Sequence, residues 1–135
     1  MQEIELKLGF DPRNIDASKT TLSELFGQPS QQKHLNNTYF DTPGNDLRKT
    51  GWSFRVRDKE GSFEQTVKGN GVVRSGLHQR LELNQAIGQR PPDISKLAEI
   101  AEIQPFLTEL QPVFTTDFLR LSWEVQTKNS LFELA

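Results

Sequence analysis

Strict alternation of polar and apolar side chains is the feature that most constrains the fold of this chain of 135 residues. Between Glu3 and Phe10, the charged residues Glu3, Glu5 and Lys7 alternate with apolar ones. Successive side chains of a β-strand point to opposite faces, so this period of two predicts a strand with one apolar face. The pattern returns over residues 35–40, 52–57, 63–68, 77–84 and 115–126, and begins again at 131. The sequence therefore predicts an antiparallel sheet that carries titratable groups on one face.

Two regions have helical rather than strand periodicity. Residues 14–26 have apolar positions at helical spacing, with Asp16 or Ser18 as candidate N-caps and Gly27 as a stop. Residues 91–103 form a second helical region that opens with Pro91 and Pro92. Glycine-containing turns are predicted at residues 59–61 and 69–71. These features together predict an α+β fold in which helices cover the apolar face of the sheet, within one domain over residues 1–135.

The composition excludes several classes of function. Lys and Arg number 16 against 18 Asp and Glu, so no overall charge attracts nucleic acid or an anionic membrane. The absence of cysteine excludes disulfides and thiolate metal sites. No signal peptide or membrane-spanning apolar stretch is recognisable. We therefore expect a cytoplasmic protein that binds neither nucleic acid nor membrane.

The charged faces of the strands have two interpretations. They are the solvated side of a half-exposed sheet, or they line a lumen in which acids, bases and a ligand satisfy one another. The bases on these faces are Lys7, Arg55, Arg57, Lys68, Arg80 and Arg120. The acids are Glu3, Glu5, Glu64, Glu82, Glu124 and Glu133. This balance suits a polyanion together with divalent cations.

Two details favour the lumen. Arginine supplies four of the six bases, and its planar donor fork matches phosphate oxygens better than the ammonium of lysine does. Glu3 and Glu5 lie about 7 Å apart along one strand face, which allows them to share a hard cation such as magnesium or manganese with a phosphate.

The order of the motifs resembles that of one known family. The chain opens with an E-x-E-x-K strand at Glu3–Lys7. The further motifs are, in order, Asn37–Thr42, Leu47-Arg48 with Gly51, Phe54–Arg57, Gln65–Gly69, His78–Glu82 and Thr115–Arg120. In this ordered set the chain resembles the CYTH domain proteins, or triphosphate tunnel metalloenzymes, and is most similar to their bacterial inorganic triphosphatases.

The resemblance implies a fold and a site. The family fold is a closed antiparallel β-barrel of eight strands with flanking helices, of which this chain would supply about seven at most. The expected activity is metal-dependent hydrolysis of inorganic triphosphate, with Mg²⁺ or Mn²⁺ bound by Glu3 and Glu5 and assisted by Glu82. The triphosphate would be bound by Lys7, Arg55, Arg57, Lys68, Arg80 and Arg120. Tyr39 and Lys68 would assist the attacking water.

One departure and several alternatives accompany the resemblance. Relatives continue beyond the strand that starts at Leu131, so we expect this chain to lack C-terminal strands and to expose a sheet edge that a second copy could pair with in a homodimer. Alternative reactions in the same fold are hydrolysis of thiamine or nucleoside triphosphates and the cyclisation of ATP by class IV-type adenylate cyclases. A non-catalytic polyphosphate-binding module and a purely structural sheet also stay open.

Overall fold

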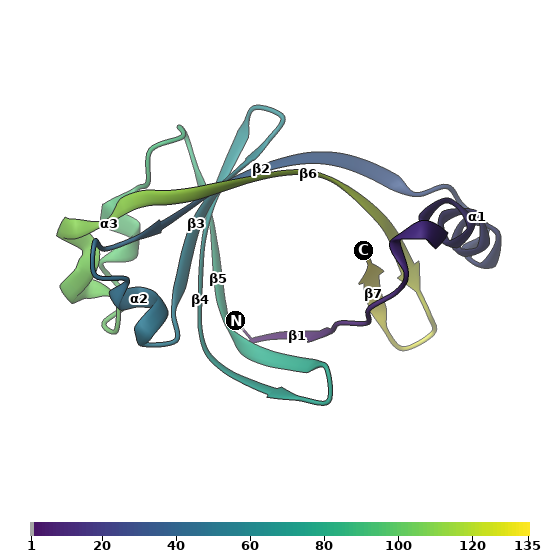
Figure 1. Ribbon diagram of the computed structural model, residues 1–135, viewed down its shortest axis with the longest axis horizontal. Coiled ribbons are helices and arrows are strands. Elements are labelled where there is room, and N and C mark those ends of the chain that lie inside the picture. The colour runs from purple at the N-terminus through teal and green to yellow at the C-terminus, as the bar shows by residue number, and fades with distance from the viewer. Residues whose placement is uncertain (1) are drawn as a thin grey trace. The chain divides into compact units, whose positions relative to one another are not determined.

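A computed structural model describes residues 2–135, apart from the side chains of Gln2 and Asn70. Its seven strands form one sheet in the order β1-β5-β4-β3-β2-β6-β7 (Figure 1). The strands are β1 (Gln2–Leu6), β2 (Gln31–Asp41), β3 (Ser53–Lys59), β4 (Ser62–Arg74), β5 (Leu77–Ile87), β6 (Gln111–Gln126) and β7 (Leu131–Leu134). The helical elements are η1 (Pro12–Asn14), α1 (Ile15–Phe26), α2 (Asp46–Lys49), α3 (Ile94–Leu97) and η2 (Gln104–Glu109). The predicted α+β class with antiparallel strands is confirmed.

The chain divides into two compact units. The first contains residues up to Lys7 together with Leu35–Asp117, and the second contains Leu8–His34 together with Phe118–Ala135. No helix among residues 2–135 is long and apolar enough to cross a membrane.

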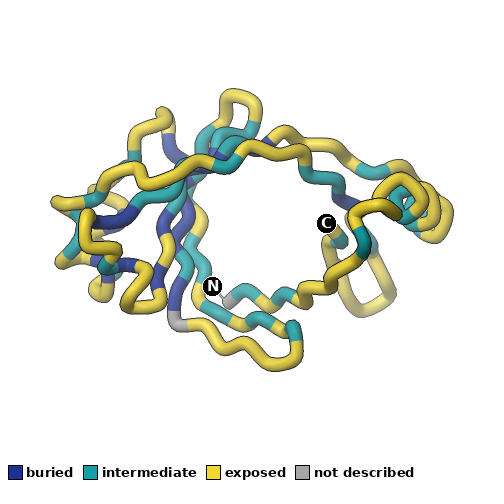
Figure 2. Tube along the Cα trace, viewed as in Figure 1, coloured by how far each residue is buried: buried dark blue, intermediate teal, exposed yellow. Residues whose placement is uncertain are grey.

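The hydrophobic core of the first unit lies on one face of β3, β4 and β5. Side chains of alternate strand residues pack there against α2, α3 and η2, and the buried residues concentrate on β3, β4 and these helical segments (Figure 2). The core consists of Leu47, Trp52, Phe54, Val56, Val67, Ile87, Leu97 and Ile103. The period-two pattern of the sequence thus predicted the apolar face of these strands, and Trp52 is a core residue as its position in the pattern indicated.

The β3–β4 hairpin forms as predicted. Lys59 pairs with Ser62 across a two-residue turn in which Glu60 and Gly61 have φ angles of 55° and 98°. Positive φ at both positions is the requirement of a type I′ turn, whose twist matches that of the flanking strands. The carboxylate of Asp58 accepts a hydrogen bond of 2.7 Å from the backbone N–H of Gly61 and stabilises the turn.

The turn predicted at residues 69–71 is wrong. Strand β4 continues through this segment to Arg74, with a bulge between Gly69 and Val72, and the chain reverses instead at Ser75 and Gly76. A Cβ atom on Gly69 would lie 2.2 Å from the indole ring of Trp52. Gly69 is therefore needed for close packing inside a strand, which the sequence alone does not distinguish from a turn.

Some predicted boundaries also change. Strand β1 ends at Leu6, so Leu8 and Phe10 lie outside it, whereas β2 begins at Gln31, before the predicted start at residue 35. The helical region at residues 91–103 contains only the four-residue helix α3. The short helix α2 was not expected at all, because it depends on the carboxylate of Asp41, which accepts hydrogen bonds from the N–H groups of Leu47 and Arg48.

The second unit contains α1 and the β6–β7 hairpin. Gly27 ends α1 in the left-handed conformation, with φ of 64°, as predicted. The N-cap is Asn14 rather than Asp16 or Ser18. Trp123, which belongs to the alternating segment at residues 115–126, is buried. The side chain of Gln28 donates a 2.8 Å hydrogen bond to the backbone carbonyl of Glu124.

Candidate functional site

The face of the sheet opposite the core carries rows of polar side chains. Because paired residues of neighbouring strands point to the same side, the register defines each row. One row runs across β2, β3, β4 and β5 and consists of Tyr39, Arg55, Thr66 and Asn84. The rows on either side consist of Asn37, Arg57 and Glu64, and of Ser53, Lys68 and Glu82. The register thus places most of the candidate site residues of the first unit on one face.

Lys68 is the centre of an ionic cluster formed by β1, β4 and β5. Its Nζ lies 2.6 Å from Oε1 of Glu3 and 3.0 Å from Oε2 of Glu82. The other oxygen of Glu3 accepts a 3.0 Å hydrogen bond from Nε of Arg80. Glu3, Lys68, Arg80 and Glu82 therefore form one cluster, although they come from distant parts of the sequence.

Glu3 is the most strongly perturbed acid of the cluster. Partial burial would raise the pKa of its carboxyl group, but hydrogen bonds with Glu82, Lys68 and Arg80 outweigh that effect and lower the pKa from 4.5 to about 2. Glu3 is therefore ionised over the whole physiological pH range.

Arg55 differs from the other predicted site bases because its Nε atom is buried without a hydrogen-bond acceptor in the described part of the chain. The side chain is half-buried, and its Nε atom is inaccessible to solvent without any hydrogen-bond acceptor among the described residues. Leaving a buried donor of a charged group unpaired costs more than leaving a neutral one unpaired. A guanidinium held in this way is suited to an anionic ligand with planar pairs of oxygens.

Arg57 is instead held by neighbours. Its Nε donates a 2.6 Å hydrogen bond to Oδ1 of Asn37, and Nδ2 of Asn37 donates a 2.9 Å hydrogen bond to the hydroxyl of Thr116. Asn37 is buried, with 1% of its surface exposed. It therefore connects β3 to β6 through β2 and fixes the direction of Arg57. The sequence placed Asn37 in a family motif but gave no signal for this role, which depends on a residue 79 positions away.

Tyr39 stacks on Phe114 of β6. Their ring centroids are 4.5 Å apart and their planes differ by 16°. Tyr39 pairs with Arg55 in the sheet register, whereas Lys68 lies in the adjacent row. No hydrogen bond joins Tyr39 to Lys68 within the described part of the chain. The structure therefore places both predicted catalytic residues on one face without direct contact.

Three further predicted residues, Glu5, Lys7 and Arg120, form ion pairs of their own. Glu5 and Lys7 contact each other at 3.5 Å, and both side chains are largely exposed. Arg120 belongs to the second unit, where it lies 2.6 Å from Glu133 in an exposed ion pair. The structure does not place these three residues at the ionic cluster.

The donor set of the cluster suits a hard cation. Glu3 and Glu82 supply carboxylate oxygens, which Mg²⁺ and Mn²⁺ prefer. Among residues 2–135 as described, no three His, Cys, Asp or Glu side chains gather closely enough to hold a metal ion. Any metal held here would therefore have two of its carboxylate ligands now engaged by Lys68.

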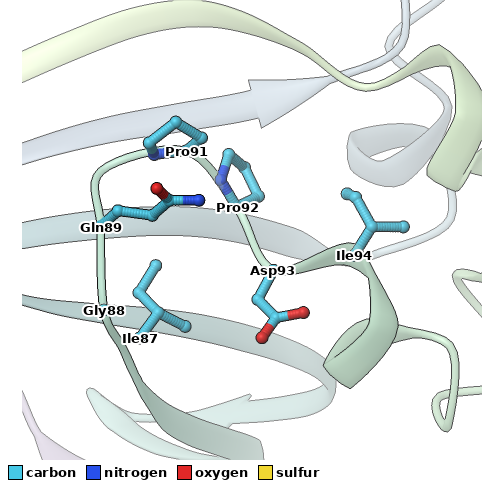
Figure 3. A pocket seen from close by; sticks show the side chains of 7 residues that line it. All are labelled: Ile87, Gly88, Gln89, Pro91, Pro92, Asp93 and Ile94. Atoms are coloured by element: carbon cyan, nitrogen blue, oxygen red, sulfur yellow. The ribbon is translucent and has the colours of Figure 1, made fainter.

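A hollow elsewhere in the first unit lacks the basic side chains of the polar face. It lies in the loop between β5 and α3 and is lined by Ile87, Gly88, Gln89, Pro91, Pro92, Asp93 and Ile94 (Figure 3). Its acidic residue, Asp93, accepts hydrogen bonds from the Ser95 hydroxyl and the Lys96 backbone N–H. This lining contains no base, so it does not suit an anionic ligand.

The chain is similar to known proteins in both sequence and fold. The family model of the CYTH domain matches residues 1–134. An inorganic triphosphatase from Haemophilus influenzae is 34% identical over 139 aligned positions, which include the whole of this chain. The chain spans 39% of the length of that relative.

Solved structures share the fold at low sequence identity. A protein from Hippeastrum, described as a candidate adenylyl cyclase with a dominant triphosphatase activity, has a TM-score of 0.65 at 14% identity, covering 98% of this chain and 69% of its own. A protein from Pyrococcus horikoshii has a TM-score of 0.59 at 21% identity, covering 93% and 66%. A candidate adenylate cyclase from Bacillus halodurans has a TM-score of 0.56 at 19% identity, covering 96% and 68%. These similarities show a common fold.

Proposed function

Because this chain belongs to the CYTH domain family, we propose that it is part of a phosphohydrolase that cleaves a linear triphosphate, with inorganic triphosphate as the substrate. The choice of substrate is supported by the Haemophilus relative, whose name is inorganic triphosphatase. The observation that carries the proposal is the buried Nε of Arg55, which has no acceptor among the residues that the structure describes and belongs to a row of polar residues. A phosphate oxygen is the acceptor that best completes this guanidinium.

The bases have separate roles in this proposal. Arg55 and Arg57 bind non-bridging oxygens of the triphosphate from β3, and Asn37 keeps Arg57 in position. Lys68 and Arg80 bind oxygens from β4 and β5 once the phosphates compete with Glu3 for their N–H groups. Lys7 and Arg120 are further candidates for binding the substrate. Fixed cations lower the barrier because they stabilise the charge that develops on the transferred phosphoryl group.

The proposed reaction is the hydrolysis of one phosphoanhydride bond. The oxygen of a water molecule forms a bond to the terminal phosphorus while the bridging P–O bond breaks, and pyrophosphate and phosphate are released. Tyr39 and Lys68 orient the water from the same face, and the Glu82 carboxylate accepts its proton. Stacking on Phe114 limits the orientations of the Tyr39 ring.

Glu3, Glu5 and Glu82 are the residues that would hold a divalent cation such as Mg²⁺ or Mn²⁺. When bound, such a cation neutralises phosphate charge and polarises the bond that breaks. The oxygen donors fit this role, since a metal ligand must be deprotonated and the Glu3 carboxylate is ionised at neutral pH.

A second candidate is a non-catalytic module that binds triphosphate. It is favoured by the small number of carboxylates at the cluster, since no group of three ligands for a metal gathers in the described part of the chain. Both functions predict binding of triphosphate, but only the hydrolase predicts turnover. A cytoplasmic location, the absence of nucleic-acid binding and a homodimer through a sheet edge stay predictions of the sequence.

The experiment that tests the proposal is phosphate release from inorganic triphosphate with Mg²⁺ or Mn²⁺, with and without a chelator. We expect release that the chelator abolishes and that the double variant Glu3→Gln, Glu5→Gln loses. The matched control is Glu99→Gln, which removes an exposed carboxylate far along the sequence and should not change the rate. Tight binding without release would support the binding module, and neither binding nor release would refute both functions.

A further inference from the structure

Four side chains of β4 and β5 form a continuous series of hydrogen bonds on the polar face. The sheet register pairs Thr66 with Asn84 and Lys68 with Glu82. The hydroxyl of Thr66 donates a 2.7 Å hydrogen bond to Oδ1 of Asn84, and Nδ2 of Asn84 donates a 2.8 Å hydrogen bond to Oε1 of Glu82. The other carboxylate oxygen of Glu82 lies 3.0 Å from Nζ of Lys68. Asn84, which the sequence did not assign to the site, therefore joins Thr66 to the ionic cluster.

The donors and acceptors of this series determine the orientation of the Asn84 amide. Carboxylate oxygens accept hydrogen bonds, so Asn84 presents its NH₂ group to Glu82. The carbonyl oxygen of the amide is then turned towards Thr66, whose hydroxyl is able to donate. Thr66 is 1% exposed, and its β-branched side chain has restricted rotation about χ1. It is therefore a rigid anchor that keeps the amide in this orientation.

Asn84 is the contact that fixes the Glu82 carboxylate. The side chain of Glu82 is 13% exposed, and its several rotatable bonds allow more than one orientation of the carboxylate. Nζ of Lys68 does not select one orientation, because it also lies 2.6 Å from Glu3 and is shared between the two acids. Asn84 contacts Oε1 of Glu82 from two positions along the same strand. This contact leaves Oε2 to face Lys68.

We propose that Asn84 is a positioning residue for the hydrolysis, because it holds the Glu82 carboxylate in the orientation in which Oε2 faces Lys68. The inference rests on the proposed function, in which Lys68 orients the attacking water and Glu82 accepts its proton. A general base works only within hydrogen-bonding distance of the proton that it accepts. Without Asn84 the carboxylate turns away from this place, while the contacts that bind the substrate remain. The turnover number kcat therefore falls, and KM does not change.

The kinetic test measures kcat and KM for inorganic triphosphate at a fixed excess of Mg²⁺. Asn84→Ala should lower kcat about tenfold and leave KM unchanged, since losing an outer hydrogen-bond partner of an active-site ligand typically costs at least about that factor. Asn84 is exposed, so its truncation leaves no cavity. Thr66→Val should also lower kcat, whereas Thr66→Ser keeps the hydroxyl and should retain the activity. The control Gln79→Ala removes an exposed amide from the opposite face of β5 and should change neither constant.

A second measurement reports on Glu82 without turnover. The chain is isotopically labelled at the carboxyl carbons of glutamate, and the NMR signal of Glu82 is assigned by its loss in Glu82→Gln. Asn84→Ala should shift this signal, because the carboxylate loses a hydrogen bond to Oε1. Thr66→Val should shift it in the same direction, because the amide loses its anchor. Gln79→Ala should leave the signal where it is.

Either measurement can overturn the positioning role. An unchanged Glu82 signal in Asn84→Ala would show that Asn84 does not hold the carboxylate, whether or not triphosphate is hydrolysed. An active chain in which Asn84→Ala and Thr66→Val keep the original kcat, or raise KM instead, would show that the contact does not serve proton transfer. If the unsubstituted chain releases no phosphate, the proposed function is refuted and the role in hydrolysis falls with it, and a shifted signal then establishes the contact alone.

Discussion

Phe54 and Arg55 are adjacent in the sequence but serve opposite faces of strand β3. Phe54 is 1% exposed and packs in the hydrophobic core, while Arg55 faces the polar rows with a buried nitrogen that lacks an acceptor. The apolar face is complete, because helical segments of the same chain cover it. On the polar face, Lys68 has two carboxylate partners, whereas the Nε of Arg55 has no acceptor among the described residues. We therefore expect the apolar face to stabilise the fold and the polar face to bind a ligand.

Removing Phe54 should produce the largest effect on folding. Phe54→Ala deletes a fully buried ring from the core and should lower the free energy of unfolding by about 3–5 kcal/mol. Urea denaturation followed by tryptophan fluorescence measures this change. Phe132→Ala removes a half-exposed ring of β7, and we expect it to cost less than about 1.5 kcal/mol. Equal losses for the two variants would contradict the assignment of the core.

Replacing Arg55 should affect binding instead of folding. Arg55→Gln should weaken triphosphate binding by about 100-fold, because it removes an unpaired guanidinium that the ligand completes. Its free energy of unfolding should change little, since the buried Nε of Arg55 has no acceptor to lose among the described residues. Arg74→Gln, an identical change on an exposed residue of β4, is the control. If both variants bind triphosphate equally well, Arg55 is not a ligand.

Replacing Glu3 should change the free energy of unfolding less than Phe54→Ala does, and the change should depend on pH. The folded-state pKa of Glu3 is about 2, below its ordinary value of 4.5, so the stabilisation is present above pH 4.5 and is lost as the pH falls towards 2. Glu3→Gln should therefore lower the free energy of unfolding by about 1–2 kcal/mol at pH 7 and by almost nothing at pH 2. The loss in free energy of unfolding caused by Phe54→Ala should stay about the same between pH 7 and pH 2, because no titratable group is removed.

Glu5→Gln is the matched control for this pH series. Glu5 contacts the exposed Lys7, and exposed ion pairs contribute about 0–1 kcal/mol. A difference between Glu3→Gln and the unsubstituted chain that stays constant from pH 7 to pH 2 would show that the cluster around Lys68 does not control the ionisation of Glu3.

The sequence predicted the hairpin, the apolar face and the side of the sheet on which the bases lie. It did not predict that Asp41 would organise α2, or that Asn37 would connect Arg57 to Thr116. Each of these contacts depends on side-chain direction and on a partner from another element. Periodicity carries no information about such partners, because it reports only the alternation within one strand.

Residues 69–71 show that local composition can also predict a wrong element. Their composition is typical of a turn, yet the ring of Trp52 requires Gly69 within a strand. The sequence by itself determined which face each strand residue takes, because alternation is a local property of extended backbone. The tertiary structure decided which charges meet, because strand order brings Glu3 of β1 beside Arg80 of β5, 77 residues away. It also decided which base stays unpaired, since that depends on every neighbour of Arg55 at once.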